Sequence, residues 1–132
     1  MAPKLILADL DGTLLDEEKH LTPRSRAALE RAAVAGCQVV IATGRFFGGV
    51  PDFLKELPFL RYFILMNGAK VYDRETDTVL YRSEIPLDTA QAVYRLMDGL
   101  GCTVDCYQND RGMMPRTYLD HLEHYIPDPW CA

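Results

Sequence analysis

The chain has 132 residues, of which 48% are hydrophobic and 25% charged, and its 14 basic and 19 acidic residues give a net charge of −5 at pH 7. This composition is typical of a soluble globular protein with one ordinary domain or two small ones, and it does not favour a disordered chain. No block of like charge is present, so the sequence predicts neither a nucleic-acid-binding tail nor a membrane-surface helix. The apolar runs are too short to span a bilayer.

The four cysteines lack the paired short spacings of a zinc site, and the N-terminus does not resemble a signal peptide. We therefore predict a cytoplasmic protein with reduced, mostly buried thiols. The cysteines are Cys37, Cys102, Cys106 and Cys131.

The chain opens with a predicted strand, helix and strand. Lys4 to Ala8 is almost entirely apolar, as is typical of a parallel strand covered on both faces. Thr22 and Pro23 supply an N-cap and a first-turn proline for a helix that ends near Gly36. The β-branched segment 38–42 follows as a second strand, and this order predicts a crossover between parallel strands.

A further helix from about Pro51 to Leu57 is predicted to lead to a third strand near Tyr62 to Met66. Its inward side chains would be Val50, Phe53, Leu54 and Leu57. Residues 1–81 are therefore predicted to form a partial doubly wound, Rossmann-like α/β layer with a parallel sheet.

From residue 82 onward the pattern changes, and residues 82–132 are predicted to form part of a separate α+β cap. Asp88 and Gln91 have the spacing of a capping box, ahead of a helix that ends at Gly99. The buried face of this helix would consist of Ala90, Val93, Tyr94 and Met97.

Three further elements are predicted in this second part. Residues 102–107 alternate in polarity like a strand with one solvated face, and a polar turn follows from Gln108 to Gly112. A last helix is predicted around Thr117 to Ile126. This second part is therefore predicted to contain helices and a strand.

The run Asp9-Leu10-Asp11-Gly12-Thr13 directly follows the first predicted strand. Alternate residues of an extended segment share a face, so Asp9 and Asp11 can reach one small site while Gly12 lets the chain turn away. An isolated Asp-x-Asp is usually a solvated turn, but its position behind an apolar strand favours a functional site. Two carboxylates in this arrangement suit metal-assisted attack on a phosphate.

Polar residues also follow the second and third predicted strands. Thr43, Gly44 and Arg45 end the second, and Asn67 with Gly68 ends the third. Ligands of open parallel sheets bind at the carboxyl ends of the strands, so these residues are predicted to share a site with Asp9 and Asp11. Thr43 also fits a helix N-cap, Arg45 fits either a substrate contact or a structural ion pair, and Asn67 with Gly68 also fits a simple turn.

These motifs, in this order, resemble those of the haloacid dehalogenase superfamily, and most closely its Cof-type phosphatases. The resemblance covers essentially the whole chain but only the front portion of the family pattern. It implies a lid inserted between the second and third motifs, and an enzyme that hydrolyses a small phosphorylated metabolite. A sugar-phosphate phosphotransferase or mutase, and a binding or interaction module without turnover, remain open as alternatives.

The resemblance also implies a role for each site residue. Asp9 would be the nucleophile that forms an aspartyl phosphate, and Asp11 the general acid and base. Mg²⁺ would bind the carboxylate of Asp9 and the backbone carbonyl of Asp11. Thr43 would hold a phosphoryl oxygen through its hydroxyl and backbone N–H, beside Gly44, which allows close approach. Arg45 and Asn67 would contact the substrate.

Two parts of the family pattern have no counterpart in these 132 residues. The family supplies a catalytic lysine and a later acidic motif beyond the lid, whereas Lys70 is the last lysine of this chain. We therefore expect the front part of a longer phosphatase, with little or no activity by itself.

The resemblance also leads to a prediction about how two copies of the chain associate. In the family the first strand is central in the sheet, with later strands on its far side. Without them, Leu5, Ile6 and Leu7 would form an unpaired apolar edge, which is a template for pairing with another chain. We predict a homodimer or a swapped arrangement that covers this strand.

Overall fold

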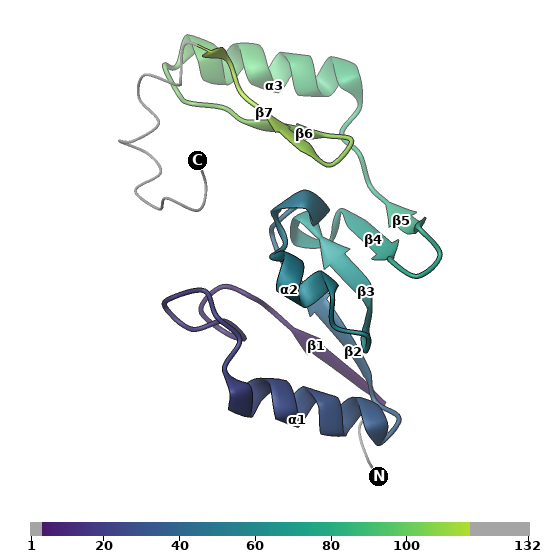
Figure 1. Cartoon of the computed structure of the whole chain (residues 1–132). Helices are drawn as coiled ribbons and strands as arrows, with labels where there is room; N and C mark the ends of the chain where they lie inside the picture. Colours follow the sequence, from purple (N-terminus) through teal and green to yellow (C-terminus); the bar gives the residue numbers. More distant parts are fainter. Residues whose placement is uncertain (1–3, 117–132) are drawn as a thin grey trace. The chain divides into compact units, whose positions relative to one another are not determined.

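The structure is a computed structural model that describes residues 4–116. The chain divides into two compact units, Met1–Glu84 and Ile85–Ala132 (Figure 1). The residues predicted to form the site all belong to the first unit. None of the helices in the described residues is long and apolar enough to cross a membrane.

The first unit is built on a five-stranded sheet with the strand order β1-β2-β3-β4-β5. β1, β2 and β3 are parallel, whereas β4 and β5 continue the sheet as an antiparallel hairpin that the sequence patterns did not predict. Parallel strands joined through a helix are the α/β layer that the sequence predicts. The strands are β1 (Leu5–Ala8), β2 (Gln38–Ala42), β3 (Leu60–Leu65), β4 (Lys70–Asp73) and β5 (Thr78–Arg82).

Helix α1 (Pro23–Val34) begins as predicted. The hydroxyl oxygen of Thr22 accepts a hydrogen bond from the backbone N–H of Ser25, and Pro23 occupies the first turn. The chain then turns at Gly36, whose φ of 86° favours glycine. Connecting β1 to β2 in this way places the carboxyl ends of both strands at one edge of the sheet.

Helix α2 (Asp52–Lys55) is a single turn, shorter than the predicted helix from 51 to 57. Val50, Leu54 and Leu57 are buried as expected, but the expectation for Phe53 is wrong because 39% of it is exposed. Phe53 directly precedes the buried Leu54, and neighbouring helical residues point about 100° apart, so the side of α2 that buries Leu54 does not bury Phe53.

The core of the first unit lies on one face of the sheet. Val39, Ile41 and Phe63 alternate along β2 and β3 and form one buried cluster with Leu29 of α1 and Leu54 of α2. Both helices therefore cover the same face. They hold the strands from one side and leave the carboxyl ends open for the site.

β1 is an edge strand of the described sheet and pairs only with β2 there. Its side chains Leu5 and Leu7 are 52% and 56% exposed, so the expectation that this strand is covered on both faces is wrong for the described residues. The side chains share the face opposite the core, because Ile6 packs against the buried cluster.

The homodimer through β1 stays a prediction. Pairing with a second copy would satisfy the free edge of the strand and cover Leu5 and Leu7. Light scattering is expected to give twice the monomer mass, and replacing Leu7 with lysine is expected to reduce that mass. The same change at Leu80, an exposed leucine of β5, is the matched control. A wild-type monomer would contradict the prediction.

Asp73 closes the turn between β4 and β5. Its carboxylate is almost fully buried and accepts hydrogen bonds from Nε and Nη2 of Arg61 at 3.0 and 2.6 Å, and from the backbone N–H of Glu75 at 3.0 Å. The contact with Arg61 is the main reason that the pKa of Asp73 is lowered to about 2. The ionised carboxylate therefore stabilises the folded hairpin.

Asp73→Asn is expected to destabilise the first unit at neutral pH and to flatten its acid dependence. Because the folded pKa lies below the ordinary value of 3.8, the stabilisation is complete above about pH 4 and disappears as the pH falls toward 2. Urea unfolding at pH 7, 4 and 2.5 measures this, with the exposed Asp52→Asn as the control. Equal pH dependence in Asp73→Asn and the wild type would contradict it.

In the second unit, α3 (Leu87–Gly99) ends where the sequence predicts. The predicted capping box is wrong, because Pro86 occupies the N-cap position and the carboxylate of Asp88 accepts from the N–H of its neighbour Thr89. Ala90, Tyr94 and Met97 are half-buried as expected, whereas the exposed Val93 contradicts the expected face. Because the helix begins at Leu87, Asp88 lies inside the first turn and cannot serve as the N-cap.

After α3, the described residues of the second unit form a short hairpin, β6 (Cys106–Gln108) and β7 (Arg111–Met113). The predicted strand from 102 to 107 is therefore wrong for its first four residues, while the polar turn is present as a two-residue loop with positive φ at Asn109 and Asp110. Cys37 is buried but Cys106 is exposed, which corrects the expectation of mostly buried thiols. The predicted helix from 117 to 126 and Cys131 lie outside the described residues.

Candidate active site

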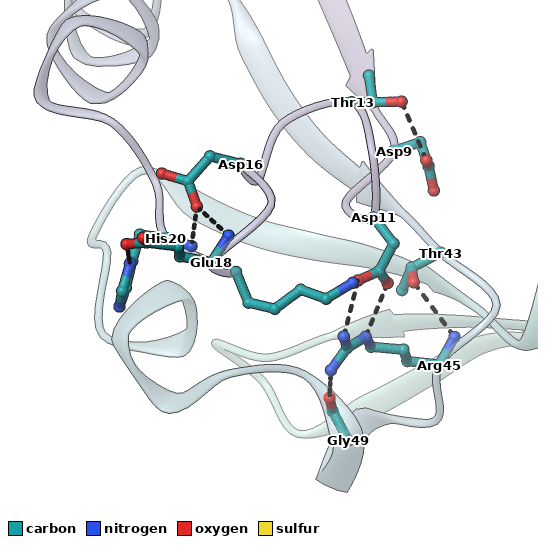
Figure 2. Close-up of polar contacts among 10 residues, drawn as sticks. Asp9, Asp11, Thr13, Asp16, Glu18, His20, Thr43, Arg45 and Gly49 are labelled. Atoms are coloured by element: carbon teal, nitrogen blue, oxygen red, sulfur yellow. Dashed lines mark hydrogen bonds and ion pairs between the residues drawn. The ribbon is translucent and has the colours of Figure 1, made fainter. Parts of the chain in front are cut away.

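Asp9 is the first residue after β1, and Asp11 follows two residues later (Figure 2). Leu10 between them is fully buried, whereas both aspartates are exposed. The φ of 75° at Gly12 lets the chain turn at once, and the hydroxyl of Thr13 donates to Oδ2 of Asp9 at 3.2 Å. The strand end therefore presents two carboxylates to solvent, with one oxygen of Asp9 already oriented.

The carboxylate of Asp11 is held by two cations. Nε and Nη2 of Arg45 donate to its two oxygens at 2.9 and 2.8 Å, a bidentate pair, and Nζ of Lys19 donates to Oδ1 at 3.1 Å. Nη1 of Arg45 also donates to the carbonyl of Gly49, at the end of the 3₁₀ turn η1 (Phe47–Gly49). Of the two roles left open for Arg45, the structure has the ion pair.

These contacts change the chemistry of Asp11. Chiefly through its hydrogen bonds with Arg45, the pKa of Asp11 is lowered to about 2, with a smaller contribution from Lys19 in the same direction. The carboxylate is therefore ionised at neutral pH and accepts protons only when these contacts are weakened.

Thr43 follows β2 and is buried. Its hydroxyl oxygen accepts a hydrogen bond from the backbone N–H of Arg45 at 3.2 Å, which leaves the hydroxyl hydrogen for another acceptor. Its own N–H donates to the carbonyl of Ile64 at 2.9 Å. The expectation that this N–H binds a phosphoryl oxygen is therefore wrong, and only the hydroxyl is available.

Asn67 lies in the 3₁₀ turn η2 (Met66–Gly68) with φ 54° and ψ 31°, a left-handed conformation that asparagine tolerates. Its N–H donates to the carbonyl of Thr43, and the N–H of Met66 donates to the carbonyl of Arg45. The segment after β3 is thereby tied to the segment after β2. A Cβ on Gly44 would lie 3.0 Å from Oδ1 of Asn67, so glycine is needed for this close approach.

Gly44→Ala is expected to displace the side chain of Asn67, because 3.0 Å is shorter than normal van der Waals contact. Since the side chain of Asn67 is exposed and Gly44 has no positive φ, stability is expected to change by less than about 1 kcal/mol. Weaker binding of inorganic phosphate with Mg²⁺ present, measured by calorimetry, would follow if Asn67 contacts the ligand. Gly99→Ala, where a Cβ meets nothing, is the control. Unchanged phosphate binding would contradict a role for Asn67.

The donor set at the end of β1 fits magnesium. Mg²⁺ prefers carboxylate and carbonyl oxygens and usually takes one or two carboxylates, with water and phosphate completing its shell. Among residues 4–116, Oδ2 of Asp9 contacts only the hydroxyl of Thr13, whereas the carboxylate of Asp11 is occupied by Arg45 and Lys19. The described residues contain no group of three acidic, histidine or cysteine side chains that could hold a metal by themselves.

The sequence patterns did not identify Lys19 as a site residue. It lies in an acidic loop, and its contact with Asp11 depends on a positive φ of 62° that no residue type at this position predicts. The contact of Thr13 with Asp9 was also missed, although the spacing of four residues across a tight turn is compatible with it.

The chain is similar to known proteins in sequence and in fold. The family model described as haloacid dehalogenase-like hydrolase matches residues 6–128. The putative phosphatase YxeH of Bacillus subtilis is 38% identical over 96 residues, which are 70% of this chain and 36% of that protein. The pyridoxal phosphate phosphatase YbhA of Escherichia coli is 37% identical over 98 residues, 74% of this chain and 36% of that protein.

A solved haloacid dehalogenase-like hydrolase from B. subtilis has the same fold, with a TM-score of 0.77 and 25% identity over 95% of this chain and 46% of that one. The chain therefore belongs to the haloacid dehalogenase-like hydrolases, as its motifs predict. It spans about a third of the length of the two curated relatives and about half of the solved structure.

Proposed function

We propose that the chain carries the nucleophile half of a Mg²⁺-dependent phosphatase that acts on a small phosphorylated metabolite of the cytoplasm through an aspartyl phosphate. The observation that carries the proposal is the position of Asp9 and Asp11 at the carboxyl end of β1, with Arg45 and the hydroxyl of Thr43 from the neighbouring strand end. The phosphatase relatives make phosphate esters the substrates to test first.

In the proposed reaction, a carboxylate oxygen of Asp9 attacks phosphorus, and the bond from phosphorus to the leaving oxygen breaks. Thr13 holds one oxygen of Asp9 and so limits rotation of the nucleophile. The hydroxyl of Thr43 donates to a phosphoryl oxygen. Bound Mg²⁺ would be held by the carboxylate of Asp9 and the carbonyl of Asp11, and would neutralise charge between carboxylate and phosphate.

Asp11 would carry the proton in both halves of the reaction. It gives a proton to the leaving oxygen, and in the second half it takes one from the water that attacks the aspartyl phosphate. Because Arg45 and Lys19 keep Asp11 ionised, the second role is favoured by the contacts present. The first role requires that Asp11 take up a proton, which becomes easier when the negative charge of a bound phosphate lies close to it.

We also propose that these 132 residues alone turn over slowly. Lys70 is the last lysine of the sequence, and no second acidic pair follows an apolar run. Removing one preorganised charge-stabilising group commonly costs about two to three powers of ten in rate, and the expected loss here involves two such groups.

A generic aryl phosphate ester, assayed with Mg²⁺ and again with EDTA, tests the proposal. Slow formation of product that requires Mg²⁺ supports the proposal, whereas fast turnover would contradict the expected low activity. A rise in melting temperature with Mg²⁺ and phosphate, but with no product, would indicate a binding module instead. Phosphoryl transfer to an added sugar in place of water would indicate a phosphotransferase.

A further inference from the structure

The loop between Asp16 and His20 is fixed by its own hydrogen bonds (Figure 2). Oδ1 of Asp16 accepts from the backbone N–H groups of Glu18 and His20 at 3.1 and 2.8 Å, and the N–H of Asp16 donates to the carbonyl of His20. An antiparallel bridge between Leu15 and Leu21 closes the base of the loop, and Leu15 is buried. The loop is therefore a rigid support for the residue at its tip.

That residue is Lys19, which has a φ of 62°, and its N–H donates to the carbonyl of Asp16 at 3.0 Å. The left-handed conformation is unfavourable for lysine and is retained here by the surrounding hydrogen bonds. It directs the ammonium to Oδ1 of Asp11, at 3.1 Å, with 30% of the side chain exposed. A strained backbone at this position thus serves to bring a cation to the end of β1.

The two cations on Asp11 differ in what else they can bind. Arg45 is anchored by a bidentate contact with Asp11 and by the carbonyl of Gly49, so it is suited to hold Asp11 in place. Lys19 has a single ion-pair partner among the described residues, although an ammonium has three donors. Its remaining donors can bind a second anion beside Asp11 without breaking the existing contact.

We infer that Lys19 is a phosphate-binding residue that donates to the phosphoryl group of a monoester dianion while it keeps its contact with Asp11. The inference rests on the proposed function, because Asp11 must lie beside the leaving oxygen for proton transfer, which brings the phosphate close to any cation on Asp11. A compact ammonium is a suitable phosphate ligand because it needs no planar partner. The site would favour a dianionic monoester over a monoanionic diester.

Two binding measurements on the full 132-residue chain test this, because phosphate affinity and Mg²⁺ affinity are expected to change in opposite directions. Lys19→Met is expected to weaken the binding of inorganic phosphate, measured at saturating Mg²⁺, by about tenfold. This is the effect of losing one charged hydrogen bond. In the absence of phosphate, the same variant is expected to bind Mg²⁺ about two- to fivefold more tightly, because a positive charge near the metal ligands is removed. Lys19→Arg is expected to restore most of both values.

Lys55→Met is the control, because the ion pair that Lys55 makes is with Asp52 and not with Asp9 or Asp11, and it is expected to change neither titration. If Lys19 only supported the structure of the loop, Lys19→Met would weaken the binding of Mg²⁺ and of phosphate together. That result would overturn the inference, and so would unchanged binding of both. If the wild type binds Mg²⁺ and phosphate and Lys19→Met binds both as the wild type does, the inference fails while the proposed function stands. A wild type that binds neither ligand would contradict both.

Discussion

Asp9→Asn is expected to abolish Mg²⁺-dependent hydrolysis of a phosphate ester, with a fall of at least about a thousandfold where the wild-type rate permits the measurement. An amide oxygen is a poor nucleophile and cannot give the acyl phosphate that water then hydrolyses. The substitution keeps the size of the side chain and leaves an oxygen to accept the hydrogen bond from Thr13. The fold of the strand end is therefore expected to remain.

A second measurement makes this prediction independent of a slow wild-type rate. Asparagine lacks the negative charge that attracts the cation, so Asp9→Asn is also expected to weaken Mg²⁺ binding, as measured by calorimetry. Asp52→Asn, an exposed aspartate at the start of α2, is the control and is expected to leave rate and affinity unchanged. Mg²⁺-dependent turnover that persists in Asp9→Asn would place the nucleophile elsewhere.

The positions of the strands β1 and β2 and of the helix α1 could be predicted from the sequence because each is specified locally. An apolar run, a Thr22 N-cap with a proline after it and a glycine stop act within one or two turns of the chain. The β4–β5 hairpin was missed because its strands alternate only weakly and its turn depends on Asp73 and Arg61, which are twelve residues apart. The exposed face of β1 was mispredicted because an apolar sequence does not say which face is covered.

In the candidate site, too, some features could be predicted from the sequence and others could not. Asp9, Asp11 and Thr43 could be proposed from motifs, since a strand end fixes where such residues lie. The contacts among them could not, because the pairing of Arg45 with Asp11 spans 34 residues and the approach of Lys19 needs an unfavourable φ. The N–H of Thr43 was assigned to a ligand, yet sheet continuation to Ile64 uses it.

Arg45→Met is expected to lower kcat by about a hundredfold with little change in KM, because Asp11 loses the group that orients it. In this structure Arg45 contacts Asp11 and Gly49, so its removal disturbs proton transfer more than substrate binding. Arg45→Lys is expected to restore little, since a point charge cannot replace the bidentate contact. A raised KM with unchanged kcat would instead make Arg45 a direct substrate contact.

The same substitution is expected to change the titration of Asp11. With Arg45 removed, the pKa of Asp11 rises from about 2 toward its ordinary value of 3.8, and Lys19 keeps part of the shift. Because the lowered pKa stabilises the fold above about pH 4 and this stabilisation is lost as the pH falls toward 2, Arg45→Met should be less stable at neutral pH. Solvent screening of the partly exposed pair limits this loss to about 1 kcal/mol. Carboxyl carbon NMR of the chain from pH 7 to 2 measures the shift, and an Asp11 that titrates alike in both proteins would show that Arg45 does not control its charge.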